Sequence, residues 1–225
     1  DGLVFDEIGA AVMDLAPDQQ NRLASVASED SSPIISSEPE QIMYSISSLD
    51  YWHGFREGVN LTVDRILRGA SNEEAFGAAI AAALDESTAT WGLQATKVIT
   101  SRFTGKNVRI AILDTGLDLM HPDLQGRMIT SRSFVSGQSV QDGNGHGTHC
   151  IGTACGSSNP PVPPRYGIAS SAHIFAGKVL SNEGSGPDSG ILEGINWAVR
   201  NRCAIVSMSL GSPANLGDPH SSVYE

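Results

Sequence analysis

The sequence predicts an α/β fold in which a doubly wound parallel sheet is preceded by a small α+β domain. Three observations predict this fold. Apolar runs typical of buried strands occur at residues 108–113, 172–180 and 203–212. Before the last run, Ile191, Ile195 and Val199 recur at i, i+4 and i+8, which is the spacing of an amphipathic helix. Alternation of strands and helices along a chain is typical of a parallel sheet with right-handed crossovers.

The smaller domain is predicted at residues 1–50. Residues 3–15 have the composition of a strand around a glycine, Gly9, and residues 16–27 that of a helix with Pro17 in its first turn. Residues 32–46 indicate another strand, in which two isoleucines lead into an alternating apolar pattern. Strand, helix and strand in this order predict a small α+β unit.

Residues 51–88 are predicted to be a helical insertion or linker. Within them, residues 71–86 combine an N-cap serine, Ser71, with Glu73 and Glu74 in the first turn and an alanine-rich body. The third domain, residues 89–225, contains the predicted parallel sheet. Its proline-rich stretch at 156–167 cannot be regular structure and is predicted to be a loop.

Charge and composition exclude several classes of function. The chain of 225 residues has 14 Lys and Arg against 25 Asp and Glu, and its formal net charge of −11 argues against nucleic acid or an anionic membrane as a partner. No apolar run approaches the ~20 residues that a membrane helix needs. The sequence has neither an initiator methionine nor a signal peptide, so Asp1 is expected to be a processed or truncated start.

The 3 cysteines are an odd number and imply no complete disulfide framework. Cys150 and Cys155 both fall on a small-residue segment that is predicted to be a helix. We expect them to pack as free thiols, in the manner of small apolar groups.

Asp114 and His146 are the candidate catalytic residues. Asp114 comes directly after the first apolar run, so its carboxylate is expected at the carboxyl end of a strand, where open α/β sheets bind ligands. His146 opens the glycine-rich segment 147–156, which is predicted to begin a closely packed helix at the same edge. A carboxylate bonded to one ring nitrogen fixes the tautomer of a histidine and leaves the other nitrogen free to act as a general base.

Four motifs carry a resemblance to a known family. The segments "DTG" at Asp114, "HPDL" at His121, "HGTH" at His146 and "SLG" at Ser209 occur together and in this order. They closely resemble the subtilisin-like serine peptidases, whose catalytic triad runs Asp, His, Ser along the chain. The resemblance implies a sheet of the subtilisin type and a serine endopeptidase, secreted or extracytoplasmic, in which Asp114 orients His146.

The resemblance also shows what these residues lack. No "GTSMA"-like segment with the nucleophilic serine occurs in the sequence. The serine and the oxyanion-hole asparagine are therefore expected beyond residue 225, on a C-terminal remainder that acts as a partner. This polypeptide alone is expected to be inactive, whether the enzyme was cut after Glu225 or deliberately shortened.

Residues 1–50 resemble the inhibitory propeptide of the same family, with "SEPE" at 37–40 in place of a related motif. The resemblance implies a chain derived from a zymogen, whose N-terminal domain assists folding and blocks the substrate site. It places self-processing at residues 84–90, just before Trp91. An N-terminal domain unrelated to inhibition is the alternative.

Substrate recognition is inferred from two segments that the resemblance singles out. They are expected to grip an extended peptide between two backbones, which implies peptide or protein substrates and broad specificity. The residues are Gly184, Ser185 and Gly186 on one wall and Ser209, Leu210 and Gly211 on the other. No cofactor is expected to be required. Asp123 matches a calcium-binding position of some relatives, but a full ligand set is not present.

Two other functions stay open at this point. A pseudoprotease would keep the peptide cleft as a binding module without catalysis. Metal-dependent hydrolysis would use Asp114, His146 and His149, although no further ligand stands at zinc-finger spacing and we expect no metal site here.

Overall fold

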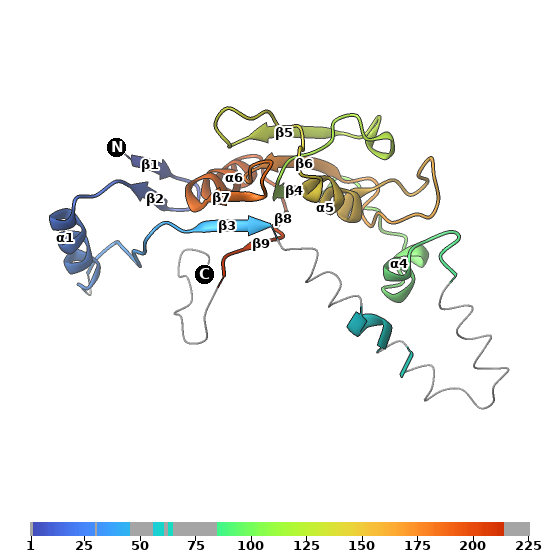
Figure 1. The fold of residues 1–225 in the computed structure, drawn as a ribbon, viewed down its shortest axis with the longest axis horizontal. Coiled ribbons are helices and arrows are strands. Elements are labelled where there is room, and N and C mark those ends of the chain that lie inside the picture. The colour runs from blue at the N-terminus through green and yellow to red at the C-terminus, as the bar shows by residue number, and fades with distance from the viewer. Residues whose placement is uncertain (1, 30, 46–55, 61–62, 65–84, 214–225) are drawn as a thin grey trace.

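The computed structural model describes residues 2–29, 31–45, 56–60, 63–64 and 85–213, and its main body is an α/β unit (Figure 1). At its centre is a sheet of four strands in the order β5-β6-β4-β8, with every neighbouring pair parallel. The strands are β4 (Arg109–Asp114), β5 (Ile129–Ser133), β6 (His173–Lys178) and β8 (Ile205–Ser207). The predicted α/β class with a parallel sheet is confirmed.

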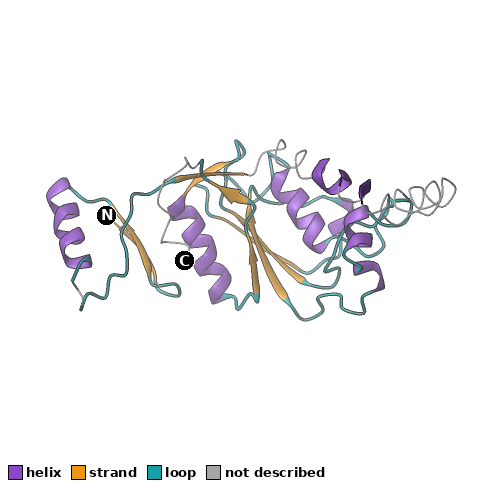
Figure 2. Ribbon diagram, turned by 90° about the horizontal axis from the view of Figure 1, so that it is seen from below, coloured by secondary structure: helices purple, strands orange, loops and turns teal. Residues whose placement is uncertain are grey.

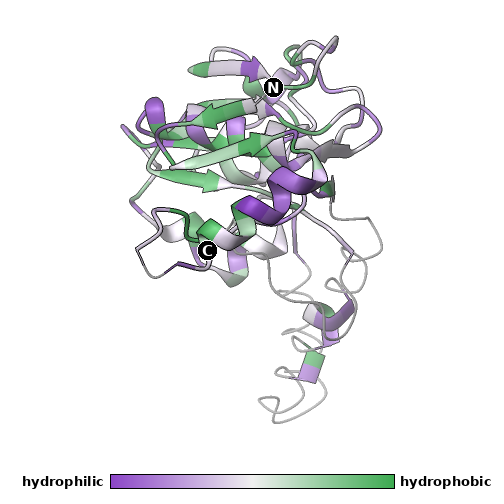
Figure 3. Ribbon diagram, turned by 90° about the vertical axis from the view of Figure 1, so that its left-hand side faces the viewer, coloured by the Kyte–Doolittle hydropathy of each residue, from purple (hydrophilic) through white to green (hydrophobic). Residues whose placement is uncertain are grey.

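Two helices cover opposite faces of this sheet (Figure 2). On β4, Ile110 and Ile112 pack in one cluster with residues of α5 (His146–Cys155). The alternate residues of the strand belong to clusters that include residues of α6 (Asp188–Arg200). Because successive side chains of a strand point to opposite faces, β4 is buried on both sides, which explains its continuous apolar run. Figure 3 shows the strands of the body as mainly hydrophobic.

The N-terminal unit differs in detail from the prediction. The single strand expected at residues 3–15 is an antiparallel hairpin of β1 (Gly2–Phe5) and β2 (Ala10–Met13), because Gly9 adopts a positive φ of 67° in the turn between them. The helix α1 (Pro17–Ala27) is confirmed, with Pro17 in its first turn. The next strand is shorter than expected, since only β3 (Ile42–Ser45) forms a ladder and Ile35 is 98% exposed.

The strand expected at residues 203–212 is divided in two. Its first part is β8 in the parallel sheet, and its last residues form β9 (Leu210–Gly211). The strand β9 leaves that sheet because it pairs with β3, and β7 (Ser185–Pro187) pairs with the other edge of β3. The result is a second sheet of order β7-β3-β9.

Shorter elements complete the body. They are α4 (Trp91–Ala95) and two 3-10 turns, Val98–Thr100 and Pro122–Leu124. The proline-rich stretch 156–167 contains no helix or strand, as predicted. Most of the helix predicted at residues 71–86 lies outside the described residues. None of the helices in the described part of the chain is long and apolar enough to span a membrane.

Close packing of backbone on backbone joins α5 to the carboxyl end of β4. Gly147 is buried, and a side chain there would collide with the backbone of Gly116. We expect Gly147→Ala to lower the free energy of unfolding by about 1–3 kcal/mol through overpacking. Gly92→Ala, where the added methyl meets nothing within 4 Å, is the matched control and should leave stability unchanged or slightly raised. Denaturant unfolding compares the two, and equal stabilities would contradict this packing.

Candidate active site

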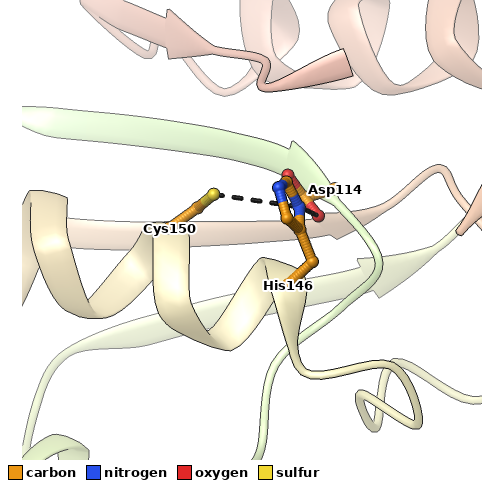
Figure 4. A group of neighbouring side chains, drawn as sticks. All are labelled: Asp114, His146 and Cys150. Carbon is orange, nitrogen blue, oxygen red and sulfur yellow. Dashed lines mark hydrogen bonds and ion pairs between the residues drawn. The ribbon is translucent and has the colours of Figure 1, made fainter. Parts of the chain in front are cut away.

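Asp114 and His146 meet at the carboxyl edge of the parallel sheet (Figure 4). Asp114 is the last residue of β4 and only 1% exposed, and His146 is the first residue of α5. Atom Nδ1 of the histidine lies 2.7 Å from Oδ1 of the aspartate. The imidazole side chain keeps 21% of its surface exposed. One partner is thus fixed inside the protein and the other reaches the surface.

This geometry determines which ring nitrogen is available for chemistry. An ionised carboxylate only accepts hydrogen bonds, so Nδ1 of His146 must carry the proton and donate it to Asp114. In the neutral ring, Nε2 is then the basic nitrogen. The hydrogen bond to Asp114 is the main cause that raises the pKa of His146 above its ordinary value, although desolvation acts in the opposite direction. The pair is therefore arranged as a general base.

Asp142 joins the loop before His146 to the end of β4. Its Oδ1 accepts hydrogen bonds from the Thr115 hydroxyl at 2.9 Å and from the Gly145 amide at 2.9 Å. Its Oδ2 accepts from the amide and the hydroxyl of Thr148 in α5, at 2.8 and 2.7 Å. Thr115 also accepts the Gly147 amide at 2.8 Å. These bonds hold the start of α5 beside Asp114.

The same contacts set the charge of Asp142. Burial acts to raise its pKa, but the hydrogen bonds from Gly145, Thr148 and Asn144 outweigh it and hold the pKa at about 2. The carboxylate is therefore ionised at neutral pH, and its charge is one of the causes that raise the pKa of His146. The aspartate of the "DGNGHG" segment was not singled out in the sequence, although Asp beside Gly and Asn is a signal for such a turn.

Lys178 is a second anchor that sequence reasoning missed. It ends β6, in register with Asp114 on β4, and its side chain is fully buried. Its ammonium donates to the Thr115 carbonyl and, at 2.9 Å, to Oδ1 of Asn182. Asn182 in turn accepts the Gly143 amide at 3.1 Å, which connects the β6–β7 loop to the histidine loop.

Cys150 belongs to the site, although we expected it only to pack as an apolar group. It lies one helical turn after His146, and its Sγ is 3.9 Å from Nδ1 of that histidine. Burial and the Asp114 charge raise the pKa of this thiol to about 11. The i, i+4 spacing on a helix was the signal for this contact.

The two segments expected to bind substrate lie on either side of a strand of the chain itself. Tyr44 of β3 is in register with Ser185 on one side and with Gly211 on the other. The Ser45 amide donates to the Gly184 carbonyl at 2.8 Å. Five of the six expected residues thus contact β3, namely Gly184, Ser185, Gly186, Leu210 and Gly211, and Ser209 stands directly before β9.

The C-terminal end of β3 lies near the loop that precedes His146. Gly184 has a φ of 82°, and a Cβ placed on it would lie 2.8 Å from Oγ of Ser45 and 3.3 Å from Nδ2 of Asn144. Asn144 stands two residues before His146. The strand therefore arrives at the histidine loop, and in Figure 1 its arrow runs toward the edge where β4 ends.

Side chains anchor β3 in the groove between β7 and β9. Met43 is buried, at 6% exposure, in an apolar cluster with Leu113, Leu180 and Ile191, whereas its neighbour Tyr44 is 48% exposed. At the other end of the strand, Glu40 accepts the Ser189 amide at 2.9 Å in the first turn of α6. A carboxylate is stabilised at a helix N-terminus.

The carboxylate of Asp123, the position that matches a calcium ligand of some relatives, is already engaged by a protein donor. It accepts the hydroxyl of Tyr166, and burial together with this bond raises the pKa of that phenol. Calcium takes six to eight oxygen ligands. Among the described residues, one group of His, Cys, Asp and Glu side chains could hold a metal ion, and it consists of Asp114, His146 and Cys150. His149 is not part of that group.

Serine peptidases use a buried aspartate bonded to a histidine, and here the pair lies at the edge of a parallel sheet, near a strand held between β7 and β9. The comparison with known families agrees. Residues 105–225, more than half of the chain, match the Subtilase family, and the chain belongs to this family of subtilisin-like serine peptidases.

Individual relatives match the same region. Subtilisin Savinase from Lederbergia lenta is 44% identical over 128 residues, which are 55% of this chain and 46% of that protein. Subtilisin DY from Bacillus licheniformis is 42% identical over 123 residues, 54% of this chain and 43% of the relative. The Intracellular serine protease of Paenibacillus polymyxa is 39% identical over 124 residues, 53% and 37% of the two chains. The match thus spans less than half the length of each of these relatives.

The anchoring role of Asp142 predicts a change in rate and in pH dependence. In the complete enzyme, Asp142→Asn removes a charge that raises the pKa of His146, so the basic form persists to lower pH and the acid limb of kcat/KM moves down. Loss of the loop contacts should also lower kcat/KM by up to about 100-fold.

Glu193→Gln is the matched control, because it also removes one negative charge, but from an exposed ion pair with Arg132. The pH profile of peptide hydrolysis measures both variants. An acid limb that stays in place in Asp142→Asn would contradict the electrostatic role.

Proposed function

We propose that this chain is the N-terminal part of a subtilisin-type serine endopeptidase zymogen, whose nucleophilic serine and oxyanion asparagine are contributed by chain beyond residue 225. The hydrogen bond between Asp114 and His146 beside a groove that binds an extended strand is the observation that supports this proposal most strongly. Peptides and proteins are the proposed substrates, and an extracytoplasmic location is part of the proposal.

In this mechanism Nε2 of His146 takes the proton from the serine hydroxyl as its oxygen attacks the scissile carbonyl. Asp114 stabilises the imidazolium that forms and keeps the ring in place. The imidazolium then gives the proton to the leaving amine. Asp114 suits this role because it is buried and its Oδ1 also accepts the Thr115 amide at 2.7 Å, which fixes the carboxylate.

The N-terminal domain acts in this proposal as an inhibitor held in the substrate groove. Besides β3 and its anchors, the hairpin contacts α6, where Asn196 accepts the Glu7 amide at 2.9 Å and Arg200 pairs with Asp6. Phe5 is buried at 3% exposure. The domain thus lies on the face of the helix that begins directly after β7.

The position of β3 changes where self-processing is expected. The strand leads to the histidine loop at Ser45, so the bonds directly after Ser45 are the ones we propose for cleavage. Residues 84–90 are less suitable. Ala89 is 3% exposed, and Thr88 and Thr90 exchange backbone hydrogen bonds with Arg165, which ties this segment to the body.

Replacement of the base is the direct test of the proposed function. His146→Ala in the complete protein should lower peptide hydrolysis by about 10⁶-fold and abolish self-processing after Ser45. Mass spectrometry of the N-terminal fragments measures processing. Retained processing in His146→Ala would contradict the assignment of His146 as the base. If the unmodified complete protein bound peptides in the groove without cleaving them, it would be a pseudoprotease.

The anchoring of β3 gives a separate test on the processed enzyme. A peptide with the sequence of residues 38–45 should inhibit it, and Met43→Ala in the peptide should weaken inhibition by about 30-fold, because the buried side chain contributes about 2 kcal/mol. Tyr44→Ala is the control with an exposed side chain and should weaken it much less. Equal losses for both peptides would show that β3 does not bind in the described register.

A further inference from the structure

Three potential metal ligands converge at the catalytic pair. One ligand atom from each of Asp114, His146 and Cys150 can be chosen so that all three lie within 4.8 Å of one another. They come from two elements, since the aspartate ends β4 and the other two residues stand one turn apart on α5. Figure 4 shows the thiol and the carboxylate close to the imidazole.

One oxygen atom of this group lacks a hydrogen-bond partner. Oδ2 of Asp114 is a buried oxygen without a hydrogen-bond partner among the described residues, whereas Oδ1 is bonded to His146 and to the Thr115 amide. A buried polar atom without a partner costs free energy, and a bound cation would satisfy it. The proposed general-base mechanism uses Oδ1 and does not require Oδ2.

The chemistry and the spacing of the ligands suit zinc. Thiolate, imidazole and carboxylate are the three ligand types that zinc binds in proteins. Tetrahedral zinc places sulfur and nitrogen ligands roughly 3.5 Å apart, and Sγ of Cys150 lies 3.9 Å from Nδ1 of His146. The partly exposed imidazole gives an ion access from solvent.

We propose that a zinc ion binds to Oδ2 of Asp114, Nδ1 of His146 and Sγ of Cys150, and that it inhibits the enzyme reversibly by changing the tautomer of the histidine. A neutral imidazole carries one proton. When zinc occupies Nδ1, that proton must move to Nε2, which can then no longer accept the proton of the serine. Binding also displaces the thiol proton of Cys150 into solvent, so zinc should bind more tightly as the pH rises.

The test uses the metal-free, processed enzyme with its complete catalytic domain. It is titrated first with cobalt(II), which reports a thiolate ligand by a charge-transfer band in the near ultraviolet, and then with zinc. We expect the cobalt band to reach its full intensity at one cobalt ion per molecule. Zinc should remove the band by displacing cobalt. Zinc should inhibit peptide hydrolysis, and a chelator should restore it. In Cys150→Val the cobalt band should be absent. The zinc concentration that halves the variant's own zinc-free rate should be at least about tenfold higher than in the unmodified enzyme.

Cys203→Ser is the matched control, because it removes another half-buried thiol and leaves the three ligands in place. It should keep both the band and the inhibition. Absence of the band in the unmodified enzyme, or equal zinc sensitivity in Cys150→Val, would overturn the proposal. Failure of the proposed protease function would be seen differently, as absent hydrolysis in a protein that still gives the cobalt band.

Discussion

The hydrogen bond between Asp114 and His146 is the interaction on which the proposed function of this structure depends. The two residues are 32 positions apart in sequence, and they meet because β4 ends where α5 begins. Much of the surrounding structure maintains that meeting. Asp142 binds the histidine loop and Thr115 together, and Lys178 connects the same threonine to the β6–β7 loop through Asn182. A buried carboxylate and a partly exposed imidazole are thereby held in a fixed orientation.

The groove beside this pair is occupied by the chain's own strand. Because β3 pairs with β7 and with β9, it satisfies the backbone of both segments and places an apolar anchor, Met43, in the cluster beneath them. Under the proposed function, removal of β3 would present two strand edges to a substrate. Substrate binding and self-inhibition would then use one set of backbone groups, which would make recognition largely independent of sequence.

The sequence was sufficient to predict the α/β class, the parallel sheet and the residues that meet at its edge, because a doubly buried strand and a glycine-rich helix start are local signals. Details that depend on long-range pairing were not predictable. The run at 203–212 is divided because its last residues pair with β3, which lies far away in the sequence. Ile34 and Ile35 were expected to belong to a strand, but within the expected segment only residues 42–45 pair with neighbouring strands. Cys150 and Asp142 acquire their roles only when the end of β4 is brought beside α5 and the loop before it.

A pH titration of the complete, metal-free enzyme, followed by NMR of the histidine side chains, tests the central claim most directly. It follows the protonation of His146 and the proton that it shares with Asp114. The account predicts that His146 titrates above 6.5, the ordinary value of a histidine pKa, and that Asp114→Asn lowers this pKa. In the unmodified enzyme, the Nδ1 proton in the hydrogen bond to Asp114 should give a signal at low field. That signal should be lost in Asp114→Asn. A His146 that titrates at its ordinary value and does not respond to the change at Asp114 would contradict the account.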